Sequence, residues 1–229
     1  MEKHPHHGII ISEIIRPPKN IIDGFGEHDV CKIGDAMGGH GLMYYEIKPV
    51  VQNMRIVGSA VTVLTRPGDA LYVQKVIEIA QLGDVVVIDA GGVKEISCIG
   101  ERLCYYMKLK DIAGVVVDGA IRDVKGIQDI DFPVFSKSVC AKIFGSIGPG
   151  AINIPIQCGG VTVNPGDIVV GDDDGVVCVP RENANNVLKT SDEHLAGELL
   201  RLKLVKEGKS ISEVFNLEEK LKKWKVHSV

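Results

Sequence analysis

The stretch between residues 100 and 123 constrains the fold of this chain more than any other. It reads GERLCYYMKLKDIAGVVVDGAIRD. Apolar residues at helical spacing predict a short helix over 101–110. The apolar run that follows predicts a strand over 112–117 that is buried on both faces, and a similar run predicts another strand over 84–88. Buried strands that alternate with helices are typical of an α/β protein.

Three charged residues flank this helix–strand unit. Glu101 begins the expected helix, and Arg122 and Asp123 follow the strand, in the first turn of a further helix expected over 122–130. In a β-α-β unit the start of the helix and the end of the next strand share one sheet edge, where ligands bind. We therefore expect the three side chains to meet. Two carboxylates and a guanidinium suit a divalent cation with an anionic, oxygen-rich substrate. Asp123 alone would also fit a plain helix start, whereas Arg122 fits one less well.

The pattern changes halfway along the chain. The first half alternates strands with helices, including a strand expected over 55–65 and an amphipathic helix over 70–82. Short β segments separated by glycine, proline and asparagine dominate residues 139–179. The sequence therefore predicts an α/β first half and a β-rich second half.

Two helices are expected at the end of the chain, over 180–206 and over 210–223. A helix pair appended to a finished body must bury its apolar face against something. We expect an α/β body of residues 1–180 and a helical arm of residues 181–229 that packs on a neighbouring subunit of a homo-oligomer.

Composition excludes several classes of function. The net charge of −4 gives no electrostatic reason to expect nucleic-acid binding. No apolar run approaches the roughly 20 residues that a membrane span needs, and the N-terminus lacks the pattern of a signal peptide. Six cysteines are scattered without a C-x-x-C pair. We therefore expect reduced thiols in a cytoplasmic protein, rather than a zinc site.

Three other clusters leave alternatives open. The histidines within residues 4–7 could hold a metal, although a solvated terminus is the more ordinary interpretation. The acidic segment 172–175 is a turn by its spacing rather than a calcium loop. The glycine-rich loop 35–41 is either a simple turn or a loop over the active site, with His40 at the distal end of the substrate.

The spacing of Glu101, Arg122 and Asp123 within this context resembles the class II pyruvate aldolases of the 4-hydroxy-4-methyl-2-oxoglutarate and 4-carboxy-4-hydroxy-2-oxoadipate type. The resemblance extends to IVGSAVTV at 56–63, PGD at 67–69, GDVVVIDAGG at 83–92, FPVF at 132–135 and NIPIQCGGVTVNPGDIVVGDDDGVVCVP at 153–180. The ribonuclease-E activity regulators, or RraA-like proteins, share the fold of this family without its chemistry. The resemblance implies a β/β/α swivelling-domain fold with a C-terminal helical extension, and rings of three subunits that sometimes stack as six.

The resemblance also implies a site for a 2-oxo acid. Asp123 would bind Mg²⁺ or Mn²⁺, and Glu101 would hold a water of that metal. Arg122 would bind the carboxylate or keto oxygen of the substrate. The N–H groups at the helix start after Gly100, notably those of Arg102 and Leu103, would receive the carboxylate.

A glutamate from the C-terminal helix of the adjacent subunit also reaches the metal's water shell in the aldolases that this chain resembles. Glu198 matches that glutamate best, and Glu193 is the second candidate. Plain helix surface is the alternative for either residue.

Such a site would cleave a 4-hydroxy-2-oxo acid and decarboxylate oxaloacetate, because both reactions pass through the pyruvate enolate. A water positioned by Glu101 is the expected base. Two departures from the family pattern concern Glu101, where aspartate is commoner, and the loop 93–98, which would face the distal end of the substrate. The alternative function is a non-catalytic regulator that binds a partner protein such as a ribonuclease. The intact charged set and the helical extension favour the enzyme.

Overall fold

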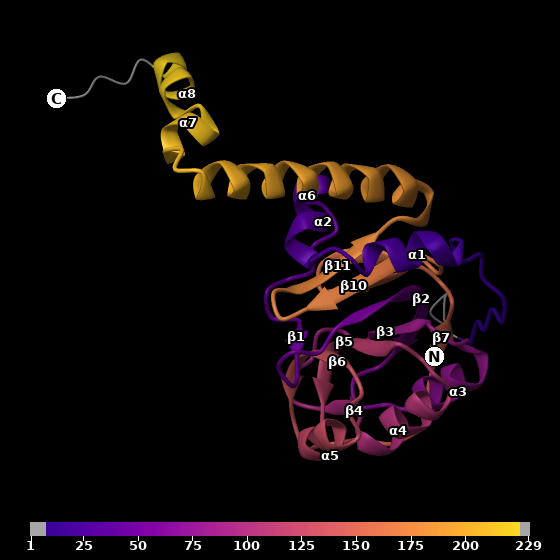
Figure 1. The fold of residues 1–229 in the computed structure, drawn as a ribbon. Helices are drawn as coiled ribbons and strands as arrows, with labels where there is room; N and C mark the ends of the chain where they lie inside the picture. The colour runs from indigo at the N-terminus through magenta and orange to yellow at the C-terminus, as the bar shows by residue number, and fades with distance from the viewer. Residues whose placement is uncertain (1–7, 225–229) are drawn as a thin grey trace.

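The computed structural model describes residues 8–224 and shows a mixed α/β body from which a helical arm projects (Figure 1). The strands are Lys48–Pro49 (β1), Ile56–Thr65 (β2), Val85–Asp89 (β3), Ser97–Ile99 (β4), Gly114–Ile121 (β5), Val134–Val139 (β6), Gly150–Ile152 (β7), Ile156–Cys158 (β8), Val161–Val163 (β9), Ile168–Asp172 (β10) and Gly175–Val179 (β11). The main sheet has the order β1-β6-β5-β3-β2-β10-β11, with β4 beside β5 and β7 beside β2. β2, β3, β5 and β6 pair in parallel, and β10 and β11 continue the sheet in antiparallel fashion. β8 and β9 form a separate ribbon.

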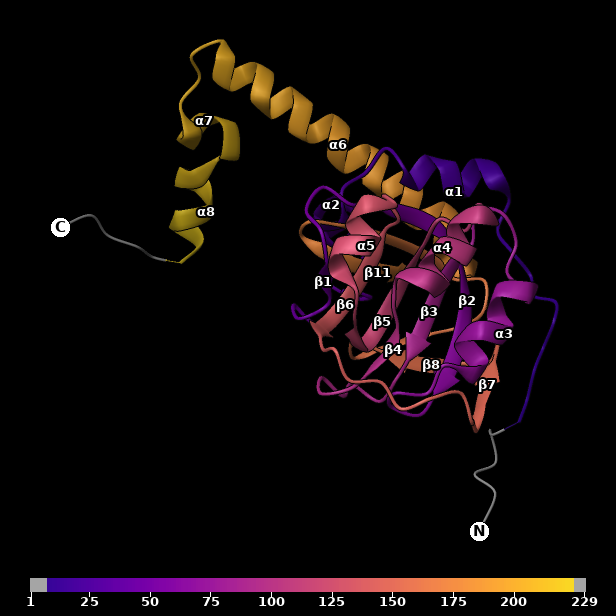
Figure 2. The same ribbon diagram turned by 90° about the horizontal axis from the view of Figure 1, so that it is seen from below.

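The helices divide between two sides of the body. They are Lys19–Phe25 (α1), Val30–Ala36 (α2), Leu71–Ile79 (α3), Glu101–Leu109 (α4), Val124–Asp129 (α5), Ala184–Lys206 (α6), Ile211–Phe215 (α7) and Leu217–Lys223 (α8). The helices α3, α4 and α5 cover the parallel strands, whereas α1, α2 and the start of α6 lie by the β10–β11 hairpin (Figures 1 and 2). This arrangement bears out the predicted α/β body with a C-terminal helix.

Two apolar cores hold these layers together. The larger one contains the fully buried valines of β3 and β5, together with Val76 of α3, Met107 of α4 and Ile127 of α5. The smaller one joins Phe25 and Ile33 to the β10–β11 hairpin. Each large side chain that is fully buried contributes roughly 1.5–3 kcal/mol to the stability of the fold. The parallel strands, which carry many such side chains, therefore contribute much of that stability.

Two predicted boundaries are wrong, and each has a local cause. The strand expected to end at 117 continues to Ile121, and the following helix begins at Val124 rather than at Arg122. The N–H of Arg122 donates to the Ile99 carbonyl at 3.1 Å, which ties Arg122 to β4. Asp123 is the N-cap residue of α5 and has left-handed backbone angles (φ 61°, ψ 39°), which are not those of a helix. Neither residue lies in the first helical turn.

The C-terminal region is also more broken than predicted. Ser210 caps α7 in a capping box with Glu213, as its position suggested. The single helix expected over 210–223 is instead interrupted at Asn216, whose φ of 52° is incompatible with a continuous helix.

The arm begins on the body and then leaves it. The buried side chains of α6 are Ala184, Val187 and Ser191, all in its first half. Beyond them the arm carries exposed apolar side chains, including Leu199, Leu200, Leu202, Val205 and Ile211. None of the helices in the described part of the chain combines the length and apolar character needed to span a bilayer. The histidines within residues 4–7 lie outside the described residues.

Candidate active site

Two helix starts and two strand ends meet at one edge of the main sheet. β4 ends at Ile99, which pairs with Ile121 of β5. Gly100 occupies the N-cap position of α4, and Asp123 occupies that of α5. The residues expected to meet at this edge therefore come from neighbouring segments, as β-α-β geometry requires.

Gly100 lies in close contact with the side chains of both Asp123 and Arg122. A Cβ atom at this position would overlap Asp123 Oδ2 and would lie 3.0 Å from Arg122 Cγ. The Asp123 carboxylate thus occupies space that every residue other than glycine would fill. The side chain of Asp123 remains 44% exposed, so its carboxylate is accessible to a ligand.

Arg122 has an unsatisfied donor at this place. Its Nε lies 3.4 Å from Asp123 Oδ2, which is an ion-pair distance. The atom is nevertheless buried and has no hydrogen-bond partner within residues 8–224. Leaving a buried donor unpaired costs about 1–3 kcal/mol. An anionic oxygen bound beside Arg122 would remove that cost.

The second carboxylate, that of Glu101, lies against α5. A Cβ atom on Gly126 would overlap it. Across residues 8–224, no group of three or more histidine, cysteine, aspartate or glutamate side chains converges on one point. Mg²⁺ and Mn²⁺ often keep several waters and take one or two protein carboxylates. The accessible Asp123 carboxylate therefore fits such an ion as a donor. The Glu101 carboxylate lies against Gly126 instead, and its role beside the metal stays a prediction.

A pocket of about 230 Å³ opens beside these residues. The predicted site residues that line it are Gly100, Arg102, Leu103, Arg122 and Asp123. The first hydrogen bond inside α4 runs from the N–H of Cys104 to the carbonyl of Gly100. The preceding N–H groups of Arg102 and Leu103 consequently have no acceptor inside the helix, as at any helix start. They offer a favourable place for an anion.

A second wall of the pocket was not predicted. It consists of Gln74 of α3 and of the loop that contains Ile143, Gly145 and Ser146. The side chains of Gln74 and Ser146 are joined by a hydrogen bond of 3.0 Å. The sequence offered one indication of this wall, and it concerns Gln74 alone. Gln74 lies near the start of the predicted helix, where side chains reach the ligand edge of an α/β sheet.

Two cysteines near the pocket are packing residues. Burial raises the pKa of Cys98 to about 12. Burial also raises the pKa of Cys104 to about 12, with a smaller contribution from the negative charge of Asp123. Both side chains therefore remain neutral thiols at physiological pH and are poor nucleophiles.

Other predicted residues lie elsewhere in this chain. Glu198 and Glu193 line a larger cavity, of about 820 Å³, between α2, α6 and α7. His40 does not line the 230 Å³ pocket, and Cys98 is the part of the loop 93–98 that does. The acidic segment 172–175 joins β10 to β11 as the predicted turn. The role assigned to Glu198 requires a second subunit, and the roles of Glu198 and His40 both stay predictions.

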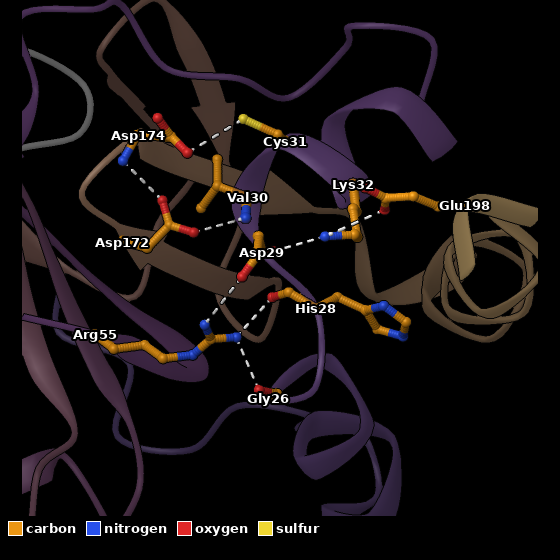
Figure 3. A network of polar contacts seen from close by, with 10 residues as sticks. All are labelled: Gly26, His28, Asp29, Val30, Cys31, Lys32, Arg55, Asp172, Asp174 and Glu198. Carbon is orange, nitrogen blue, oxygen red and sulfur yellow. Dashed lines mark hydrogen bonds and ion pairs between the residues drawn. The ribbon is translucent and has the colours of Figure 1, made fainter. Parts of the chain in front are cut away.

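Polar contacts hold α6 to the body through α2 (Figure 3). Lys32 Nζ lies 2.7 Å from Asp29 Oδ2 and 3.5 Å from Glu198 Oε2. The hydrogen bond from Lys32 lowers the pKa of Asp29. His28 is buried, and its Nε2 lies 2.9 Å from Asp192 Oδ1 on α6. One polar pair, Lys32 with Glu198, therefore joins α2 to α6, and a second, His28 with Asp192, joins α6 to the segment just before α2.

Arg55, which immediately precedes β2, also makes hydrogen bonds to the segment between α1 and α2. It donates to the carbonyls of Gly26 and His28 at 2.8 and 2.6 Å (Figure 3). The Asp172 carboxylate accepts from the N–H of Val30 at 2.9 Å. The segment that leads into α2 is thereby tied to both the sheet and the hairpin.

The mixed sheet, its helical layers and the pocket at the end of β4 and β5 define an α/β fold of the RraA type. Comparison with known proteins agrees: the chain belongs to the RraA-like (aldolase/RraA) family, whose model matches residues 30–178. A relative from Halalkalibacterium halodurans, provisionally named a 4-hydroxy-4-methyl-2-oxoglutarate aldolase, is 40% identical over 74% of this chain and 80% of its own. An uncharacterized protein of Methanocaldococcus jannaschii is 32% identical over 92% of this chain and 99% of its own. The crystal structure of Streptomyces coelicolor RraAS2, described as an unusual member of the RNase ES inhibitor RraA family, superposes with a TM-score of 0.73 at 28% identity. It covers 82% of this chain and 98% of its own.

Proposed function

We propose that this protein is a carbon–carbon lyase that depends on a divalent metal and cleaves a 4-hydroxy-2-oxo acid to pyruvate and a second oxo acid. The observation that carries the proposal is the close approach of Gly100, Arg122 and Asp123 beside the pocket. The name of the H. halodurans relative supports a substrate of the 4-hydroxy-4-methyl-2-oxoglutarate class. 4-Carboxy-4-hydroxy-2-oxoadipate belongs to the same class.

Arg122 is the proposed anchor of the 2-oxo acid. Its guanidinium carries the buried Nε donor that is unpaired in the described chain, and a carboxylate or keto oxygen would pair with it. The N–H groups of Arg102 and Leu103 would receive the carboxylate at the start of α4. Cleavage places negative charge on the keto oxygen, and the fixed positive charge of Arg122 stabilises that oxygen in the transition state.

Asp123 and Glu101 are the proposed metal-side residues. A Mg²⁺ or Mn²⁺ ion held by Asp123 would supply a Lewis acid that polarises the keto group of the substrate. Glu101 would orient a water that takes the proton from the C4 hydroxyl. The same arrangement of residues would support decarboxylation of oxaloacetate, since that reaction also builds negative charge on the keto oxygen.

The arm is proposed to complete the site of a neighbouring subunit in a homotrimer or homohexamer. The exposed apolar side chains of α6 and α7 support this, because a soluble monomer seldom exposes such a row. Glu198, which lies on the same helix, is the residue proposed to reach the neighbour's pocket.

The second candidate function is a non-catalytic regulator that binds a partner protein such as a ribonuclease. The similarity to RraAS2, at 28% identity, favours it. The unpaired Arg122 donor beside an accessible Asp123 favours the enzyme, since a pure binding protein has no need of that donor.

The test is pyruvate formation from oxaloacetate and from 4-hydroxy-4-methyl-2-oxoglutarate, with excess Mg²⁺ and with EDTA. We expect pyruvate with Mg²⁺ and its loss with EDTA. Asp123→Asn should lower the rate by at least about 100-fold, because it weakens the hold on the metal that would stabilise the negative keto oxygen, and losing one such stabilising group typically costs that much. Asp129→Asn, the same change at a more exposed aspartate of α5, is the control and should retain the wild-type rate. Absence of pyruvate from the folded wild-type protein with either substrate would refute the proposal.

A further inference from the structure

The pocket has two chemically different walls. The wall formed by Gly100, Arg122 and Asp123 is charged. The other wall is neutral and consists of the Gln74 amide and the Ser146 hydroxyl, which are joined by a hydrogen bond from Gln74 Nε2 to Ser146 Oγ. A 2-oxo acid anchored by Arg122 would extend its far end toward this neutral wall.

Ser146 is held in place from both sides. The carbonyl of Gly145 accepts a hydrogen bond from the N–H of Ala70 at 2.8 Å. On the other side, the fully buried carboxylate of Asp69 accepts from the N–H groups of Ile147 and Gly148 at 2.8 and 2.9 Å. The hydroxyl of Ser146 is therefore presented by a fixed backbone, which is what a specific contact requires.

The pair retains unused hydrogen-bonding capacity. One N–H of Gln74 is engaged by Ser146, which leaves the second N–H and the amide oxygen. Ser146 accepts that bond and keeps its own hydroxyl hydrogen for donation. The wall therefore offers two donors and one acceptor to a ligand and carries no charge.

We propose that Gln74 and Ser146 determine specificity by binding the carboxylate at the far end of the substrate, on the fragment that leaves as the second oxo acid. The inference rests on the proposed function, because it assumes a 2-oxo acid anchored at Arg122. Two neutral donors directed at one carboxylate select a dicarboxylate over a 2-oxo acid that ends in a methyl group.

The test measures two ligands that lack the C4 hydroxyl and so resist cleavage, 2-oxoglutarate and 2-oxopentanoate, as inhibitors of pyruvate formation by the Mg²⁺-loaded protein. The first has a far carboxylate and the second has a methyl group there. We expect Gln74→Leu and Ser146→Ala each to lower the preference for 2-oxoglutarate by about tenfold, the usual effect of losing a hydrogen bond to a charged group. Gln74→Glu should lower it further, because it places a negative charge opposite the carboxylate.

A purely structural role for the pair would give a different result. Loosening the loop would weaken both ligands equally and leave the preference unchanged. Gln128→Leu, the same substitution on the exposed face of α5, should leave both inhibition constants at their wild-type values. An unchanged preference in all three pocket variants of an active enzyme would overturn this inference alone. A wild-type protein that neither forms pyruvate nor binds either ligand would overturn the proposed function and this inference with it.

Discussion

Substituting Gly100 with alanine tests the geometry of the site through a single methyl group. The new Cβ atom would overlap the Asp123 carboxylate and crowd Arg122 Cγ at 3.0 Å. Gly100 is buried and follows β4 directly, so the backbone has little room to retreat. The Asp123 carboxylate must therefore move, by roughly 1 Å, to regain an ordinary contact distance.

The size of the expected effect follows from that displacement. A misplacement of about 1 Å at a reacting centre costs about 100-fold in rate, or about 2.7 kcal/mol of transition-state stabilisation. Overpacking should also lower the free energy of unfolding by about 1–3 kcal/mol. The assay is the initial rate of pyruvate formation over a Mg²⁺ titration, with urea unfolding of the same samples.

Gly126→Ala is the informative comparison for this variant. Its Cβ would meet the far end of Glu101, a long and exposed side chain that can swing away. We expect a smaller rate loss than in Gly100→Ala and an unchanged Mg²⁺ dependence, since Asp123 is left in place. A folded Gly100→Ala protein with a wild-type rate and wild-type Mg²⁺ dependence would refute the assignment of Asp123 to the reaction.

Two further predictions concern stability. The Asp84 side chain is 2% exposed and accepts two hydrogen bonds from Arg16, at 2.8 and 2.7 Å. Asp84→Asn should therefore lower the free energy of unfolding, measured in urea, by about 2 kcal/mol. An unchanged midpoint of urea unfolding would mean that the pair with Arg16 does not stabilise the fold. The pKa of both Cys98 and Cys104 rises from 9.0 to about 12 on folding, so the folded protein retains these protons at higher pH than the unfolded chain. Stability from these thiols is full below pH 9 and is lost as the pH rises toward 12. The double alanine variant should show a shallower alkaline decline in thermal midpoint, and an equal decline would contradict the argument.

The sequence was sufficient to predict the sheet edge on which the site is built. The apolar runs of β3 and β5 identified strands buried on both faces, and chain order then placed Glu101, Arg122 and Asp123 at one sheet edge. Arg122 and Asp123 line the pocket at that edge, whereas Glu101 does not. These inferences depend on local hydrophobic pattern and on the fixed handedness of β-α-β units, which one sequence contains.

The parts that escaped prediction depend on tertiary contacts. Asp123 takes a left-handed conformation next to Arg122, which is bonded to β4, a strand of three residues with no clear pattern of its own. Ser146 reaches the pocket because the buried Asp69 anchors its loop. No local sequence pattern connects Asp69 with Ser146, because they lie far apart in the chain. The same is true of Gln74 and Ser146.

The helical arm is attached to the body near one end and projects freely from it at the other. At about 1.5 Å per residue, the 23 residues of α6 extend for roughly 35 Å, and the side chains that it buries against the body all lie in its first half. A small tilt at this attachment is magnified toward α7 and α8. The pairs that set the tilt, His28 with Asp192 and Lys32 with Glu198, lie at the attachment rather than at the free end. Substitutions around α2 can therefore redirect the arm, and change which surface it reaches, without altering any residue at its tip.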